Sequence, residues 1–279
     1  MRTDRSAASA ILLMVRHSAA LLDRKRATAG GGPMLGRRSV SSNTAANRHE
    51  GITLRQAALV AGVADLLNPV SYAEFSIYPK LVVASNAEQT VRNISAHLGL
   101  FAAAILCYII SFIGDVVIAW ALYILLAPVN RALSLLTAWF QLVYAAIALC
   151  SVFSLLETYN ALATPYFLTV FGSGQLHAQV WLLLHSFHYE WSMSLVIFGI
   201  HLLLLGYLIY RSGYVPWILG IALIIAGLGW IIAGLGPFVL PNANLDFTFI
   251  TAFGEVFFIL WLWIRGWKIE EPAVISFDH

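Results

Sequence analysis

Long apolar runs separated by short polar segments make up most of the chain, and this pattern predicts membrane-spanning helices. Between residues 98 and 267 the sequence carries only eight formal charges, and most of its apolar runs are about twenty residues or longer. A helix of about 20 apolar residues crosses the roughly 30 Å hydrocarbon core of a bilayer. We therefore expect an all-α polytopic membrane protein, a bundle of six transmembrane helices at residues 56–78, 98–126, 133–156, 178–210, 215–240 and 247–267.

The first of these segments is the least regular. Residues 56–78 carry Asp65, Asn68, Pro69 and Glu74, and on its own such a segment is typical of an amphipathic helix in a soluble protein. The apolar runs that follow favour a span packed inside the bundle, with a kink at Pro69.

Composition and charge agree with a membrane protein. Hydrophobic residues make up 60% of the chain and charged residues 11%, with a mean hydropathy of +0.79, whereas soluble domains are about a quarter charged. The net charge of +2 does not indicate a nucleic-acid partner. Cys107 and Cys150 lie in different apolar runs, so neither a disulfide nor a cysteine metal site is expected.

The distribution of basic residues predicts the orientation in the membrane. Lys80 and Arg92 are the basic residues expected on the outer side. Ten basic residues precede the first span, and the remaining ones follow the second, fourth and sixth, at Arg131, Arg211, Arg265 and Lys268. By the positive-inside rule both termini are cytoplasmic. We expect a multi-pass protein of the cytoplasmic (inner) membrane of a bacterium.

Residues 1–52 are predicted to form a basic, disordered tail ahead of a transmembrane domain at residues 53–268. The tail holds nine basic and three acidic residues and shows no sustained apolar periodicity. A cleaved signal or transit peptide and a start at Met34 are the alternatives. The lipid bilayer is the expected partner, with anionic head groups contacting the tail. Residues 269–279 are predicted to form a short C-terminal tail.

Three glycines of the predicted fifth span, Gly220, Gly227 and Gly234, are seven residues apart and share one face. Small residues allow helix backbones to approach closely in lipid. We interpret this face as a packing surface within the bundle, with a homo-oligomer contact as the alternative.

Polar side chains at similar depth on five of the spans form the main candidate site. Counting from the cytoplasmic end of each span at about 1.5 Å per residue places them roughly 12–16 Å deep. The five are Asp65, Asp115, Gln141, His201 and Glu255. An ionisable group at this depth costs at least about 2–3 kcal/mol unless it is paired or hydrated. We therefore expect the five to converge inside the bundle as a ligand-binding layer.

This composition leaves three interpretations open. Carboxyl groups, an imidazole and an amide suit proton relay, cation coordination or recognition of a small polar ligand. A second interpretation is a structural or assembly protein whose polar layer only fixes the packing. A third is a metal-dependent intramembrane enzyme with Asp115, His201 and Glu255 as ligands, although the sequence has no HExxH spacing. No cofactor and no catalytic residue is assigned.

A pair of histidines lies nearer the predicted outer surface. His185 and His188 are three residues apart and share one face of the fourth span. Contact with head groups or water explains the pair, and a surface metal site is the alternative. Tryptophans near the ends of spans fit an interfacial aromatic belt, and they are Trp181, Trp191, Trp217, Trp263 and Trp267.

Several short motifs resemble those of a known family. They are LYILL at 122–126, PVNR at 128–131, FGIH at 198–201, GYLIYRSGYVP at 206–216 and AGLG at 226–229. Over residues 55–268 the chain resembles the bacterial membrane family of domain of unknown function 4386 (DUF4386). The resemblance implies a six-helix membrane protein, supplies no established activity and does not include the basic tail.

Overall fold

The computed structural model of the protein describes residues 52–83, 85–164, 166, 170, 172–239, 245 and 247–269, and these residues form helices and connecting turns with no strand. The predicted N-terminal tail and nearly all of the predicted C-terminal tail lie outside the described residues. The prediction of an all-α fold is confirmed.

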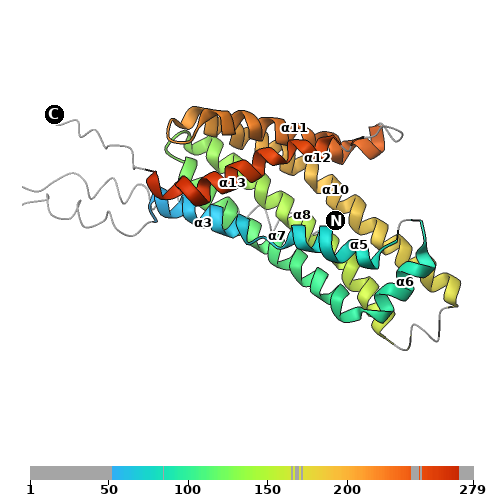
Figure 1. The fold of residues 1–279 in the computed structure, drawn as a ribbon. Helices are drawn as coiled ribbons and strands as arrows, with labels where there is room; N and C mark the ends of the chain where they lie inside the picture. Colours follow the sequence, from blue (N-terminus) through green and yellow to red (C-terminus); the bar gives the residue numbers. More distant parts are fainter. Residues whose placement is uncertain are drawn as a thin grey trace, which may run out of the picture. The chain divides into compact units, whose positions relative to one another are not determined.

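Long helices make up most of the described chain (Figure 1). They are α7 (Leu98–Leu126), α8 (Arg131–Ala163), α10 (Ser173–Ser212), α11 (Trp217–Val239) and α13 (Phe253–Arg265), the last preceded by the short α12 (Thr248–Thr251). Five described segments are long and apolar enough to cross a membrane: Leu98–Leu126, Arg131–Ala163, Gly174–Ser212, Trp217–Gly236 and Thr248–Lys268. These segments correspond to the second to sixth predicted spans.

Two of the long helices extend beyond the predicted spans. Helix α8 begins at Arg131, where the Asn130 side chain accepts a hydrogen bond from the backbone N–H of Leu133 at 3.0 Å. It continues past residue 156 because no glycine or proline interrupts it before Thr164, which precedes Pro165 in the sequence. Helix α10 has 40 residues and is therefore about 60 Å long, twice the thickness of a hydrocarbon core.

The first predicted span is not a continuous helix. Helix α3 (Leu54–Leu66) starts with a capping box between Thr53 and Gln56 and ends before Pro69. Short helical pieces follow it, namely α4 (Val70–Tyr72), the π-helical turn η1 (Ala73–Ile77) and α5 (Tyr78–Leu81). Proline lacks an N–H group and clashes with the preceding turn, so a break rather than a kink results here. With 13 residues, α3 is only about 20 Å long.

Between the first and second predicted spans, residues 87–96 form helix α6 (Ala87–Ala96). The Asn86 side chain caps this helix by accepting from the backbone N–H of Gln89 at 2.9 Å. Its buried residues are Thr90, Val91 and Ile94, which gives α6 an apolar stripe too short to appear as a span.

Glycines bring α10 and α11 into close contact. A Cβ atom at Gly206 would lie 2.6 Å from the carbonyl oxygen of Gly220, and one at Gly199 would lie 2.5 Å from that of Gly227. A Cβ at Gly234 would likewise lie 2.6 Å from the carbonyl oxygen of Ser192. The Gly220, Gly227 and Gly234 face thus packs against α10 of the same chain, in agreement with its interpretation as a packing surface within the bundle.

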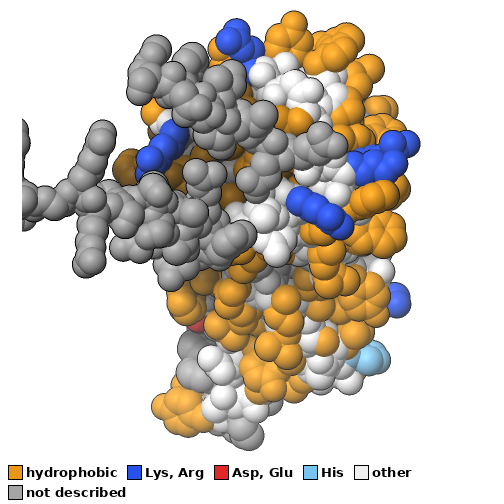
Figure 2. All heavy atoms as spheres, turned by 90° about the vertical axis from the view of Figure 1, so that its left-hand side faces the viewer, with side chains coloured by type: hydrophobic (Ala, Val, Ile, Leu, Met, Phe, Trp, Pro, Cys, Tyr) orange, Lys and Arg blue, Asp and Glu red, His pale blue; other side chains and the backbone are white. Residues whose placement is uncertain are grey.

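Helix ends with basic residues meet at one end of the bundle, which we call the basic end. Helices α3 and α13 run antiparallel, with Gly62 against the backbone of Trp263 and Gly266 against Ala58. The exposed basic residues of the basic end are Arg55, Arg131, Arg211, Arg265 and Lys268. Figure 2 shows this end of the bundle, with Lys and Arg side chains on a largely hydrophobic surface. The described residues place Lys80 and Arg92 toward the opposite end, near α6, which we call the α6 end (Figure 1).

The turn between α10 and α11 is fixed at the basic end. Gly213 follows α10 with a φ of 73°, a left-handed conformation that glycine adopts without a Cβ clash. The Tyr214 hydroxyl donates to the carbonyl oxygen of Leu125 at the end of α7. Burial raises the pKa of Tyr214 to about 12, which keeps the hydroxyl protonated as a donor.

The outer surface of the bundle is apolar where a soluble protein would be polar. On α7 the exposed side chains include a stripe at spacings of three and four residues: Leu106, Ile110, Ile113, Val117 and Trp120. The opposite face, with Tyr108 and Phe112, is buried. Together with the five apolar helices, this surface identifies a lipid environment.

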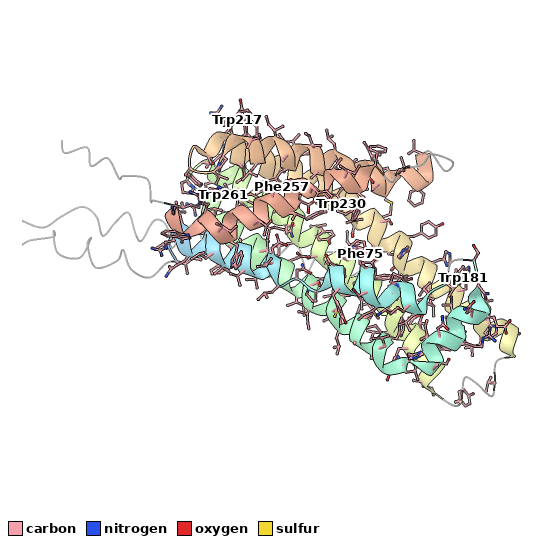
Figure 3. All side chains as sticks on the ribbon, viewed as in Figure 1. Phe75, Trp181, Trp217, Trp230, Phe257 and Trp261 are labelled. Carbon is pink, nitrogen blue, oxygen red and sulfur yellow. The ribbon has the colours of Figure 1, made fainter. Side chains whose placement is uncertain are left out.

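Tryptophans occupy the ends and the interior of the bundle. Trp181 lies toward the α6 end and Trp217 toward the basic end (Figure 3). Trp191, predicted to lie in the interfacial belt, instead packs within the bundle, with its ring centroid 5.8 Å from those of Tyr108 and Phe187. Trp191 thus contributes to the core of the bundle.

Candidate functional site

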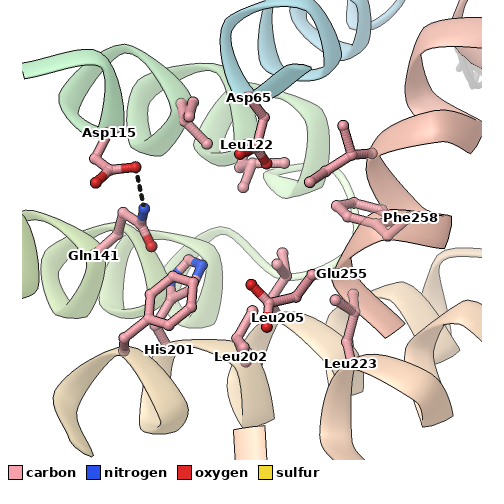
Figure 4. Close-up of a pocket in the computed structure, with 13 residues that line it drawn as sticks. Asp65, Asp115, Leu122, Gln141, His201, Leu202, Leu205, Leu223, Glu255 and Phe258 are labelled. Atoms are coloured by element: carbon pink, nitrogen blue, oxygen red, sulfur yellow. Dashed lines mark hydrogen bonds between the residues drawn. The ribbon is translucent and has the colours of Figure 1, made fainter. Parts of the chain in front are cut away.

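A cavity of about 50 Å³ lies where six helices meet, and all five residues of the predicted polar layer line it. Asp65 comes from α3, Asp115 from α7, Gln141 from α8, His201 from α10 and Glu255 from α13. In Figure 4 the side chains of Asp65 and Glu255 point toward the same space from their two helices. Apolar side chains complete the lining: Ile118, Leu122, Phe198, Leu202, Leu205, Leu223, Phe258 and Ile259.

Asp115 and Gln141 form a buried pair between α7 and α8. The Gln141 amide nitrogen donates to Asp115 Oδ1 at 3.4 Å (Figure 4). Gln141 is 2% exposed and Asp115 6% exposed, so neither residue is in contact with the lipid-facing surface. The amide oxygen of Gln141 is buried and has no hydrogen-bond partner. An unpaired buried acceptor of this kind costs about 1–3 kcal/mol unless a water or ligand pairs with it.

His201 has a defined tautomer in this arrangement. Its Nδ1 lies 2.9 Å from the carbonyl oxygen of Thr137, and only a protonated Nδ1 can donate to a carbonyl. In a neutral ring the lone pair is then on Nε2. The ring stacks on Phe198, with centroids 5.8 Å apart. The imidazole is thus held in a fixed orientation at the wall of the cavity.

The other two carboxyl groups come from discontinuous helices. Asp65 lies in the last turn of α3, directly before the break at Leu67–Asn68–Pro69, where Asn68 Oδ1 accepts from the backbone N–H of Val70 at 3.1 Å. Glu255 lies in the first turn of α13, just after the α12–α13 junction at Ala252. The indole N–H of Trp230, on α11, donates to Glu255. Asp65, Asp115 and Glu255 interact electrostatically with one another.

Most of the ionisable side chains that line this cavity are acidic. Three of them are acidic and none is Lys or Arg. A water molecule needs about 10–15 Å³ of such a volume, so the cavity has room for about four waters, or for one small cation with part of its hydration shell. Pockets for drug-sized ligands are about 300 Å³ or larger. A cavity of this size fits an ion or a few water molecules.

Comparison with known protein families shows to which family the chain belongs. The sequence profile of the domain of unknown function DUF4386 matches residues 60–266. The chain belongs to the DUF4386 family. An uncharacterised protein of Archaeoglobus fulgidus is 32% identical to this DUF4386 protein over 186 residues, which cover 67% of the present chain and 91% of that protein. No solved structure matches the chain.

The match covers all five polar residues that line the cavity of the DUF4386 protein and excludes the basic tail. It also contains both helix breaks, at Pro69 and at Ala252. The cavity is therefore built within the family domain.

No preformed metal centre is present among the described residues of the DUF4386 domain, since no three His, Cys, Asp or Glu side chains there come close enough to hold one ion. Asp115, His201 and Glu255 are therefore not close enough to one another to hold one metal ion together. His185 and His188, the other candidates, are occupied by their own contacts. His185 Nδ1 lies 2.8 Å from the carbonyl oxygen of Trp181, and the His188 ring stacks on Tyr78 at 5.4 Å.

Two contributors to the site were not predicted from the sequence. Thr137 contributes a backbone carbonyl, which leaves no signal in the side-chain pattern. Trp230 has a signal in its position, because it lies in the middle of an apolar run whereas most tryptophans lie near the ends of spans.

Proposed function

We propose that the protein binds a small cation, a proton or a monovalent metal ion, in this cavity and passes it across the membrane. One observation carries the proposal: three carboxyl groups from three helices line one small cavity that no Lys or Arg side chain lines. Carboxyl groups inside a membrane are costly, and they are typical of ion and proton pathways.

The breaks in the helices support the same function. Transporters place ions beside discontinuous helices, where the carbonyl groups at the end of a half-helix face a cavity. Asp65 lies at such an end of α3, and the C-terminal end of a helix carries partial negative charge. This end therefore adds to the attraction of the three carboxyl groups for a cation.

Each polar residue then has a role. Asp115 and Asp65 exchange the bound cation, or a proton, with water in the cavity. The free amide oxygen of Gln141 and the lone pair on Nε2 of His201 accept hydrogen bonds from that water or from a protonated carboxyl group. Trp230 orients the Glu255 carboxyl group. Phe198 and the leucines of the lining limit the volume to a few water molecules.

The rival function is a structural or assembly protein in which the same residues only fix the packing. The bonds from Gln141 to Asp115, His201 to Thr137 and Trp230 to Glu255 join neighbouring helices, as such a protein requires. The unpaired Gln141 oxygen and the cavity are not required for packing, and they favour the transport function.

Ion flux into proteoliposomes tests the proposal. Purified protein is reconstituted in vesicles that contain a pH-sensitive dye or a sodium-sensitive dye, and a membrane potential is imposed with potassium and valinomycin. We expect the wild-type protein to raise the flux of one of the two cations above that of empty vesicles. Asp115→Asn and Glu255→Gln should lower this flux at least tenfold, because the amides cannot release a proton or neutralise a cation.

Glu157→Gln is the matched control. It makes the same chemical change at an exposed carboxyl group on α8 that does not line the cavity, and it should retain wild-type flux. Equal fluxes in wild-type and empty vesicles for both cations, or full activity in Asp115→Asn, would contradict the proposal and leave the structural function.

A further inference from the structure

A second group of polar side chains lies between the cavity and the α6 end. The Tyr108 hydroxyl, on α7, donates to the Glu74 carboxyl group on the π-helical turn η1. Glu74 also interacts electrostatically with Tyr78, and the Tyr78 ring stacks on His188 at 5.4 Å. Tyr108 is completely buried, whereas His188 is exposed. The group therefore reaches from the surface into the interior of the bundle.

Aromatic side chains with polar atoms continue from this group to the cavity. The Trp191 ring contacts Tyr108 and Phe112, with centroids 5.8 Å and 6.2 Å apart, and the Phe112 ring contacts Tyr144 at 6.3 Å. The Trp191 N–H is buried, and no acceptor meets it with hydrogen-bond geometry. Tyr144 interacts electrostatically with Asp115, and its ring lies 4.7 Å from that of Phe198, which lines the cavity.

Helix geometry orders these residues along the membrane normal. At about 1.5 Å per residue, Tyr144 lies roughly 5 Å beyond Gln141 toward the α6 end, Tyr108 about 10 Å beyond Asp115, and Trp191 about 15 Å beyond His201. Glu74 is separated from Asp65 by the broken part of the first segment. Counted along the helix axes, Trp191 and Tyr108 thus lie toward the α6 end, Tyr144 lies nearer the cavity, and Asp115 lines the cavity.

We propose that Glu74 and Tyr108 form the proton access site of the cavity and that the cation passed by this protein is the proton. The inference rests on the proposed function and specifies its ion. A π-helical turn, an uncommon element often found at functional sites, presents Glu74 to Tyr108. Hydroxyl groups transfer protons without a wide aqueous path, whereas a metal ion would have to leave its water to pass between the packed rings.

The proton transfer from Glu74 to Asp115 needs only water as an additional reactant. When Glu74 is protonated, the Tyr108 hydroxyl rotates so that its oxygen accepts from Glu74. Glu74 then gives its proton to the Tyr108 oxygen while the Tyr108 hydroxyl proton moves to a water molecule, so that tyrosine stays neutral. The buried Trp191 N–H can only donate, so Trp191 is not itself a step of the relay. The water passes a proton through the Tyr144 hydroxyl in the same way to the Asp115 carboxylate.

The groups that face Glu74 come from three elements. They are Tyr78 on α5, Tyr108 on α7 with its neighbour Cys107, and His188 on α10 through Tyr78. Uncharged hydroxyl groups surround the carboxyl group directly, and no Lys or Arg forms an ion pair with Glu74 within the described residues. Glu74 is thus able to change its protonation state without breaking a salt bridge.

The rate of proton flux in Glu74→Gln and Tyr108→Phe proteoliposomes tests the inference. Glutamine keeps an oxygen to accept the Tyr108 bond, so Glu74→Gln retains the fold; size-exclusion profiles and unfolding temperatures check both variants. We expect proton flux to fall at least tenfold in each variant and sodium flux to stay at the level of empty vesicles in all samples. Glu88→Gln, an exposed carboxyl group on α6, is the matched control with wild-type flux.

Equilibrium protonation separates a slow access step from a damaged cavity. The infrared band of the protonated Asp115 carboxyl group, assigned with Asp115→Asn, should titrate in Glu74→Gln as in the wild type, because only the rate has changed. Wild-type proton flux in both access variants would overturn the inference and leave the proposed function in place, provided that Asp115→Asn is inactive. Flux of sodium but not of protons in the wild type would also overturn it. Absence of both fluxes in the wild type would overturn both proposals.

Discussion

The α10–α11 pair and the helices around the cavity are packed in opposite ways. Between α10 and α11, glycines let the two backbones touch, and no polar side chain is needed. Around the cavity, neighbouring helices are joined by side-chain hydrogen bonds and leave about 50 Å³ unfilled. The first arrangement maximises contact and the second maintains a space, so the two regions should respond differently to mutation.

The largest expected effect on stability is at the glycine contact. In Gly227→Ala the new Cβ would lie 2.6 Å from the carbonyl oxygen of Gly199, and the helices must separate. Overpacking of this kind costs about 3 kcal/mol, measured as a loss of unfolding free energy in detergent.

Gly114→Ala is the control for that substitution. A Cβ at Gly114 meets nothing within 4 Å, and alanine is a better helix former than glycine by up to about 1 kcal/mol. Unfolding free energy should be unchanged or slightly higher. Equal losses in both variants would mean that the close approach of α10 and α11 does not determine stability.

A smaller effect is expected where one donor supports the cavity. Trp230→Phe keeps the aromatic ring and removes the N–H that bonds to Glu255. Loss of a hydrogen bond to a carboxyl group costs about 2 kcal/mol, and the misplaced Glu255 should lower cation flux several-fold. A variant with reduced stability and full flux would show that Trp230 serves packing alone.

The smallest expected effect lies at the helix break. Asn68→Ala removes the side-chain oxygen that accepts from the backbone N–H of Val70, and the loss of such a hydrogen bond costs about 1 kcal/mol. The unfolding temperature should fall slightly while flux persists, since α3 still ends before Pro69. No change in unfolding temperature would show that Pro69 alone fixes the break.

The depth of the polar layer could be predicted from the sequence because a helix rises by a constant 1.5 Å per residue and the bilayer penalises charge along its whole depth. That is why Asp115 and Glu255 stood out in their apolar runs, and why counting added Asp65, Gln141 and His201. The family and the apolar helical fold could be predicted for similar reasons, since both depend on local patterns.

The contacts of those residues could not be predicted, because depth does not fix the rotation of a helix about its axis. Trp230 faces Glu255, and the carbonyl of Thr137 faces His201, only through the packing of different helices. The sequence predicted a kink at Pro69, whereas the helix ends there. A proline can either kink a helix or end it, and the sequence alone does not decide between the two. Whether the broken first segment also crosses the membrane as a sixth span, and the cytoplasmic location of the termini, stay predictions.

Flux and stability measured on one preparation of Asp115→Asn test the central claim most directly. Asparagine has the shape of aspartate and keeps an oxygen to accept the Gln141 bond, so the unfolding free energy should change by less than about 1 kcal/mol. Cation flux in proteoliposomes should fall at least tenfold in the same preparation. Full flux, or a loss of flux that only accompanies a loss of folded protein, would contradict a transport role for the cavity and assign its polar residues to packing.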